Sequence, residues 1–214
     1  MISDAAFEQK HDVEQVHFIF VGNAFFIKGG REMLKVLSGF ENRYDFKLTL
    51  ISSLQIHDYF TQAAYEDRLE IQDIIRSKKW IEHYANLSND RVLEKCREAT
   101  VGLFPSMADT YGYAVLEMQA AGCPVITTNV RAFPEINNEE CGWICHLPVN
   151  DQNMCNKEAL PELSHQLELE LRKCISDILE NPHTIKEKGR KAMERIQRMH
   201  NPKTYSDTIR SLTG

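Results

Sequence analysis

Short apolar runs recur along the chain and alternate with longer amphipathic stretches. The runs are rich in β-branched and aromatic residues and are too short for buried helices, so each predicts a strand. They cover residues 16–22, 46–52, 80–84, 100–104, 125–127 and 142–146. Amphipathic stretches predict helices over residues 30–40, 65–79, 89–99, 111–121, 160–179 and 182–199.

This alternation predicts the α/β class. We expect a single doubly wound, Rossmann-like domain over residues 16–200, with a parallel six-stranded sheet of strand order 3-2-1-4-5-6. The polar residues 1–15 are interpreted as a flexible lead-in. Residues 201–214 are interpreted as a C-terminal helix or tail.

The segment between residues 104 and 127 carries the strongest chemical signal. It reads as strand, loop, helix, Gly-Pro break and strand, and Asp109 and Gly112 fall in the loop before the helix. In parallel sheets, ligands bind at the carboxyl ends of the strands, beside helix N-termini that favour anions. Gly112 allows close backbone approach to a ligand, and Glu117 follows on the helix.

This segment resembles the signature of the group 1 (family 4) glycosyltransferases, whose two-Rossmann-domain fold is called GT-B. In that signature two glutamates are separated by seven residues, and Asp109 and Glu117 have the same spacing here. The other matching positions are Pro105, Ser106, Gly112, Ala121, Gly122, Pro124, Val125 and Ile126. The resemblance covers residues 16–212 and corresponds to the C-terminal, donor-binding half of a GT-B enzyme.

A second family signature, Val-Gly-Arg-x-x-x-x-Lys-Gly, is matched by Gly22, Lys28 and Gly29. The resemblance implies that Lys28 binds the donor diphosphate. The signature arginine is replaced by Asn23, which donates hydrogen bonds without neutralising charge. Arg31 is a hypothetical substitute for that arginine, and the alternative is a solvated surface residue.

The resemblance also implies roles for the remaining site residues. Glu117 would accept hydrogen bonds from two ribose hydroxyls of the donor, and Asp109 would face the donor sugar near its anomeric carbon. The leaving diphosphate would be stabilised by Lys28 and by backbone amides. The candidate catalytic residues are therefore Asp109 and Lys28, and the candidate substrate-binding residues are Gly22, Asn23, Gly29, Arg31, Thr110, Tyr111, Gly112 and Glu117.

Composition excludes several other classes of protein. The net charge is −6, so no basic field favours nucleic acid, and no apolar run is long enough to span a bilayer. Residues 1–10 lack the apolar core of a signal peptide, so a cytoplasmic location is expected, with any membrane contact made through a partner. The six cysteines lack partners at zinc spacing, so we expect neither a metal nor a cofactor. A glycine-rich dinucleotide motif and a P-loop are both missing.

We therefore expect a retaining glycosyltransferase, or its donor-binding half, that transfers sugar from a nucleotide-diphosphate sugar, UDP- or GDP-linked, to an acceptor. The alternative is a non-catalytic nucleotide-sugar-binding module or one subunit of a two-chain glycosyltransferase, and a sugar-nucleotide epimerase of the same fold ranks third. An acceptor-binding lobe or partner chain would need an apolar contact face. Phe133, Trp143 and Tyr205 are candidates for that face, or for the core.

Overall fold

A parallel six-stranded sheet forms the centre of the computed structural model, which describes residues 1–12, 15–56 and 59–200. The strand order β3-β2-β1-β4-β5-β6 confirms the predicted topology. The strands are β1 (Val16–Val21), β2 (Phe46–Ile51), β3 (Ile81–Tyr84), β4 (Val101–Phe104), β5 (Val125–Thr128) and β6 (Gly142–Cys145).

Strand β1 lies in the middle of the sheet, between β2 and β4. Its side chains at Phe18, Ile19 and Phe20 are fully buried, so both faces of the strand are covered. This explains why residues Phe18 to Val21 form a continuous apolar run instead of an alternating pattern.

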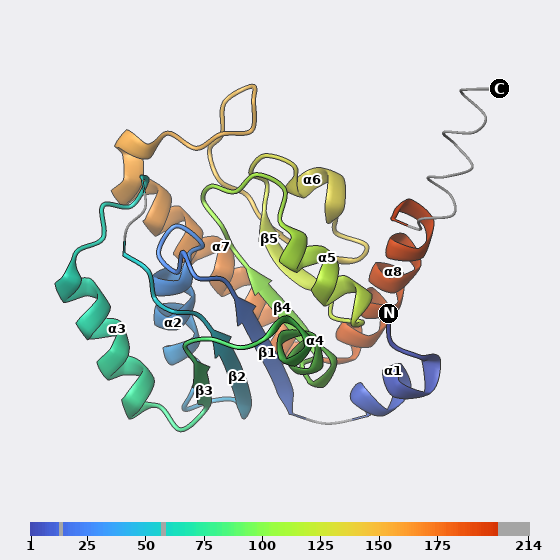
Figure 1. The fold of residues 1–214 in the computed structure, drawn as a ribbon. Helices are drawn as coiled ribbons and strands as arrows, with labels where there is room; N and C mark the ends of the chain where they lie inside the picture. Colours follow the sequence, from blue (N-terminus) through green and yellow to red (C-terminus); the bar gives the residue numbers. More distant parts are fainter. Residues whose placement is uncertain (13–14, 57–58, 201–214) are drawn as a thin grey trace.

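Helices cover both faces of the sheet. Figure 1 shows α4 and α5 in front of the strands, with α2 and α7 behind them. Helix α7 packs on α2 and β6, and α8 packs on α5. The helices are α1 (Asp4–Lys10), α2 (Gly30–Ser38), α3 (Tyr65–Ser77), α4 (Asn89–Glu98), α5 (Tyr113–Ala120), α6 (Phe133–Ile136), α7 (Leu160–Glu180) and α8 (His183–Met199), with a 3-10 turn at Lys157–Ala159.

The direction of chain progression through the sheet reverses between β1 and β4. The β1–α2 loop and the β4–α5 loop leave these neighbouring strands at their carboxyl ends. In open α/β sheets this switch point is the place where ligands bind. The fold therefore brings the two segments that carry the candidate site residues to one edge of the sheet.

The structure corrects the prediction of a flexible lead-in over residues 1–15, because residues 4–10 form helix α1. The Ser3 hydroxyl accepts a hydrogen bond from the Ala6 N–H and caps this helix. Phe7 is fully buried, and the Lys10 ammonium donates to the Ala121 carbonyl oxygen at 2.7 Å. One apolar anchor in a polar stretch was too weak a pattern to predict this docking.

The short helix α6 was also missing from the sequence prediction. Phe133 and Trp143 are 0 % and 5 % exposed, so both belong to the core and not to a contact face. Tyr205, and the helix or tail expected over residues 201–214, lie outside the described residues. Within the described ranges no helix is long and apolar enough to cross a bilayer.

Candidate functional site

Lys28 and Asp109 meet at the carboxyl edge of the sheet. The Lys28 ammonium donates a hydrogen bond to the Asp109 carboxylate at 2.6 Å, although the two residues are 81 positions apart in sequence. The side chains are 18 % and 14 % exposed, so the ion pair is largely shielded from water. The two candidate catalytic residues therefore form one charged unit in the free protein.

The β1–α2 loop fixes the position of Lys28. Its ammonium lies 4.2 Å from the centre of the Phe104 ring, within the range of a cation–π contact. A Cβ atom on Gly22 would lie 2.4 Å from Cδ of Lys28, so the lysine stem passes directly over this glycine. Gly29 follows with φ of 70°, and a Cβ there would lie 2.4 Å from the Pro105 carbonyl oxygen. Only glycine at these two positions lets the loop pack this closely.

Hydrogen bonds tie the β4–α5 loop to the β1–α2 loop. The Met107 N–H donates to the Ile27 carbonyl oxygen at 2.9 Å, and the Ser106 hydroxyl donates to the Ala108 carbonyl oxygen at 2.8 Å. The Thr128 hydroxyl donates to the Ser106 carbonyl oxygen at 2.6 Å. These bonds hold the residues that precede Lys28 and Asp109 in register, so the ion pair rests on a fixed backbone.

Two helix N-termini face this edge of the sheet. Helices α2 and α5 both begin after a left-handed glycine, Gly29 and Gly112, and neither has a side-chain cap. The free N–H groups of such helix starts attract anions. The Thr110 N–H donates to the Asp109 carboxylate at 2.8 Å, and the Thr110 side chain is exposed. This edge therefore combines the Lys28 cation with the backbone N–H groups of two helix starts.

Glu117 lies one helical turn into α5 and is half-buried. Its carboxylate has no hydrogen-bond or ion-pair partner among residues 1–12, 15–56 and 59–200. Burial raises the pKa of Glu117 above its ordinary value because no neighbour compensates for the lost hydration. A carboxylate in this state is ready to accept hydrogen bonds from a ligand.

Asn23 and Arg31 occupy different surroundings. The Asn23 side-chain oxygen accepts from the Ser53 N–H at 3.3 Å, which links the β1 and β2 loops. Arg31 lies 3.4 Å from the Asp67 carboxylate on α3 and 3.6 Å from that of Glu32. Its charge is therefore already engaged, and its use on a donor phosphate would require this pairing to open.

Tyr111 is half-buried beside the exposed Tyr113, with ring centres 5.3 Å apart. No cluster of three or more histidine, cysteine or carboxylate side chains able to hold a metal is present in the part of the chain that the structure describes. Cys141 and Cys145 are both buried thiols.

Comparison with known proteins identifies the family of the chain. The family model described as Glycosyl transferases group 1 matches residues 2–192, which is most of the chain. The chain belongs to this family. The match includes both the Lys28 loop and the Asp109–Glu117 segment.

Individual relatives agree with the family. An uncharacterised glycosyltransferase of Methanocaldococcus jannaschii is 26 % identical over 136 residues, which cover 64 % of this chain and 33 % of the relative. The C-terminal domain of a group 1 family glycosyl transferase from Francisella tularensis superimposes with a TM-score of 0.63 and 14 % identity, covering 92 % of each chain. HepE of Anabaena, in complex with UDP and glucose, has a TM-score of 0.63 and 13 % identity, covering 98 % of this chain and 53 % of HepE. The chain spans about one third of the archaeal relative and about half of HepE.

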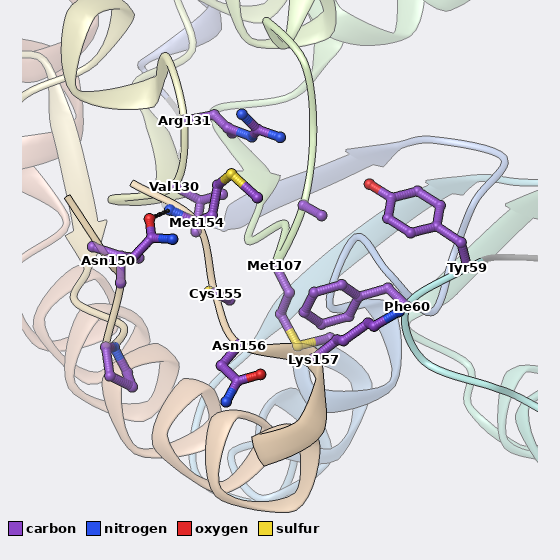
Figure 2. Close-up of a pocket in the computed structure, with 13 residues that line it drawn as sticks. Tyr59, Phe60, Met107, Val130, Arg131, Asn150, Met154, Cys155, Asn156 and Lys157 are labelled. Carbon is purple, nitrogen blue, oxygen red and sulfur yellow. Dashed lines mark hydrogen bonds between the residues drawn. The ribbon is translucent and has the colours of Figure 1, made fainter. Parts of the chain in front are cut away.

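A cavity of about 670 Å³ opens among the loops at this edge of the sheet, and sequence reasoning missed it (Figure 2). Ala108, which precedes Asp109, lines it, and so does Met107. The other walls come from Tyr59 and Phe60, from the loop after β5, which includes Arg131, and from residues between positions 148 and 157. No periodicity marks these residues because they lie in loops that meet only in the folded chain.

Proposed function

We propose that the chain is the donor-binding part of a retaining glycosyltransferase that uses a nucleotide-diphosphate sugar. The observation that carries the proposal is the shielded Lys28–Asp109 pair at the switch point of the sheet, between two uncapped helix N-termini. Membership of the group 1 family supports glycosyl transfer as the reaction class. The remaining contacts to the acceptor would come from a second lobe or a partner chain.

The leaving group is the first chemical problem of such a reaction. When the bond between the sugar and the phosphate breaks, its electron pair goes to the departing diphosphate oxygen, which gains negative charge. The acceptor oxygen bonds to the sugar, and its proton passes to that diphosphate oxygen. Lys28 has three N–H donors, and one is directed at Asp109. The others, with the backbone amides of Tyr111 and Gly112, would stabilise the diphosphate as charge develops.

Glu117 and Asp109 would hold the two ends of the donor. The unpaired, half-buried Glu117 carboxylate fits a pair of ribose hydroxyls, each hydrogen bond contributing about 1.5–3 kcal/mol. Asp109 would face the sugar, and its bond to Lys28 would place it beside the scissile phosphate oxygen. UDP is the first nucleotide to test, because HepE, which shares the fold, was solved with UDP and glucose.

A binding module without transfer activity is the second candidate. Asn23 stands at the position of the signature arginine, and the charge of Arg31 is engaged by Asp67 and Glu32. The diphosphate would then meet one cation instead of two. This arrangement favours a chain that binds the donor and depends on another chain for catalysis.

Product stereochemistry tests the proposal. The chain is incubated with UDP-glucose and with GDP-mannose, and the anomeric proton of the released sugar is followed by NMR from the first minutes, before mutarotation. Release of the α-anomer, lost in Asp109→Asn, is the expected result. Release of the β-anomer contradicts retention. Binding of the donor without release in any condition favours the binding module.

A further inference from the structure

The side chains that line the cavity in Figure 2 differ in charge from the protein as a whole. The chain has 31 acidic residues and a net charge of −6. The described residues that line the cavity nevertheless include two cations, Arg131 and Lys157, and no carboxylate. Neither cation has a hydrogen-bond or ion-pair partner for its side chain among the described residues, and both are exposed. An anion entering this cavity would meet attraction without competing internal pairs.

Much of the wall between the two cations is apolar, and Asn150 and Asn156 also line the cavity. Met107 and Val130 are 1 % exposed, and Phe60 is 5 % exposed. Figure 2 shows Arg131 at one end above Met154, and Lys157 at the other end beside Met107 and Phe60. A ligand that fills the cavity therefore needs an apolar or aromatic body together with an anionic group.

The backbone at Arg131 and Asn153 has a positive φ, which residues other than glycine adopt infrequently. Arg131 has φ of 53° and Asn153 has φ of 54°. The Arg131 N–H donates to the Asn153 carbonyl oxygen at 2.7 Å, and the Asn153 amide donates back to the Arg131 carbonyl oxygen. Non-glycine residues held in this way cluster at ligand sites, where surrounding structure maintains the strain.

The hairpin over residues 149–155, which contacts Arg131, is held together by its own hydrogen bonds. Val149 and Cys155 form an antiparallel bridge, and the Asn150 side chain accepts from the Met154 N–H at 3.0 Å. The hairpin thus presents Met154 to the cavity and fixes Asn153 against Arg131 (Figure 2). This wall of the cavity is therefore held in place by hydrogen bonds within the fold.

We propose that this cavity binds the acceptor, and that the acceptor carries a phosphate or carboxylate next to an apolar or aromatic body. Arg131 would hold the anionic group in a bidentate manner, with Lys157 as the second cation. The inference rests on the proposed function, because Ala108, which lines the cavity, directly precedes Asp109, where the sugar would be transferred. It assigns to this chain a share of acceptor recognition in addition to donor binding.

Four small probes test the chemistry: phenyl phosphate, benzoate, phenyl β-D-glucoside and inorganic phosphate. The full chain is labelled at its methionine methyl groups, and the Met107 and Met154 signals are followed by NMR during titration. Phenyl phosphate or benzoate should shift both signals and bind at least tenfold more tightly than the neutral glucoside or inorganic phosphate. Equal binding of the glucoside refutes anion recognition, and no shift with any probe refutes the site. Comparing phenyl phosphate with benzoate separates the two anion types.

Arg131→Gly separates recognition from folding, because glycine tolerates the positive φ. This variant should lose at least tenfold in affinity for the anionic probe while its thermal midpoint is unchanged or higher. Arg97→Ala, which removes an exposed arginine lining a different cavity, should leave binding unchanged. Unchanged probe affinity in Arg131→Gly overturns the proposal.

UDP distinguishes failure here from failure of the proposed function. Arg131→Gly should bind UDP as the unmodified chain does, and saturating UDP should not displace phenyl phosphate. Competition between the two would mean that the cavity binds the donor diphosphate, which contradicts the acceptor assignment. Loss of UDP binding in Lys28→Met with the cavity probe still bound would keep the two sites independent.

Discussion

Neutralising the Lys28–Asp109 pair one residue at a time should separate its role in stability from its role in binding. Lys28→Met removes the ammonium and keeps the stem over Gly22, and Asp109→Asn keeps the shape of the carboxylate. Either single change leaves a charge that is largely shielded from water without its partner. The double variant leaves neither charge.

The expected magnitude follows from the exposures. Exposed ion pairs contribute about 0–1 kcal/mol, and breaking fully buried pairs costs about 3–5 kcal/mol. With side chains 18 % and 14 % exposed, the coupling energy in a double-mutant cycle should be about 1–3 kcal/mol. For a domain of this size, that corresponds to a change of roughly 2–12 °C in the thermal midpoint.

Chemical denaturation and UDP titration of the four proteins form the assay. Lys28→Met should weaken UDP binding about tenfold or more, and the double variant should regain stability without regaining affinity. Asp109→Asn should bind UDP about fivefold more tightly, because the carboxylate no longer repels the diphosphate.

The pair between Lys35 and Glu168 is the control for this cycle. Its atoms are 2.7 Å apart, but the lysine is 65 % exposed, so its coupling energy should stay below about 1 kcal/mol. Equal coupling in both pairs would refute the reasoning from burial. Weaker UDP binding in Asp109→Asn than in the unmodified chain would refute the proposed competition between carboxylate and diphosphate.

Further predictions concern stability and pH. Because burial raises the pKa of Glu117, Glu117→Gln should be more stable than the unmodified chain at pH 7, and this gain should shrink in denaturation experiments as pH falls towards 4. The variant should also lose UDP affinity. A loss of stability at pH 7 would contradict the prediction. Burial lowers the pKa of His17 from its ordinary 6.5 to about 4, so stability should fall as pH drops through this range, and His17→Gln should reduce that fall by about 2–4 kcal/mol; an identical pH profile in the variant would refute this. Gly29→Ala should cost more than about 2 kcal/mol in denaturation, because φ is 70° and the new Cβ would lie 2.4 Å from the Pro105 carbonyl oxygen, whereas Gly39→Ala, with φ of −71°, should cost less than about 1 kcal/mol; similar costs would show that backbone strain is not decisive.

The sheet was predictable because each buried strand carries its own pattern. The run at residues 16–22 is apolar from Phe18 to Val21, as expected for a central strand covered on both faces, and the structure places β1 there. Helix α1 was not predictable in this way, because its docking depends on Phe7 and Lys10 meeting α5 and its C-terminal turn. A single buried aromatic residue gives no periodicity.

In the candidate site, too, local motifs were predictable and features formed by distant loops were not. Lys28 and Asp109 each stood out in a short local motif, and the topology of the sheet then explains their contact at 2.6 Å. The cavity between Arg131 and Lys157 arises from loops that are far apart in sequence. The φ of 53° at Arg131 is a property of the folded backbone. Sequence patterns carry no record of either property.

The central claim is that the edge between Lys28 and Glu117 binds a nucleotide diphosphate. Calorimetric titration of the chain with UDP, GDP and ADP, beside Lys28→Ala and Glu117→Ala, tests it most directly. We predict binding of one nucleotide that is lost in both variants, which would also identify the base. Binding that persists in both variants, or no binding of any nucleotide, would contradict the donor site.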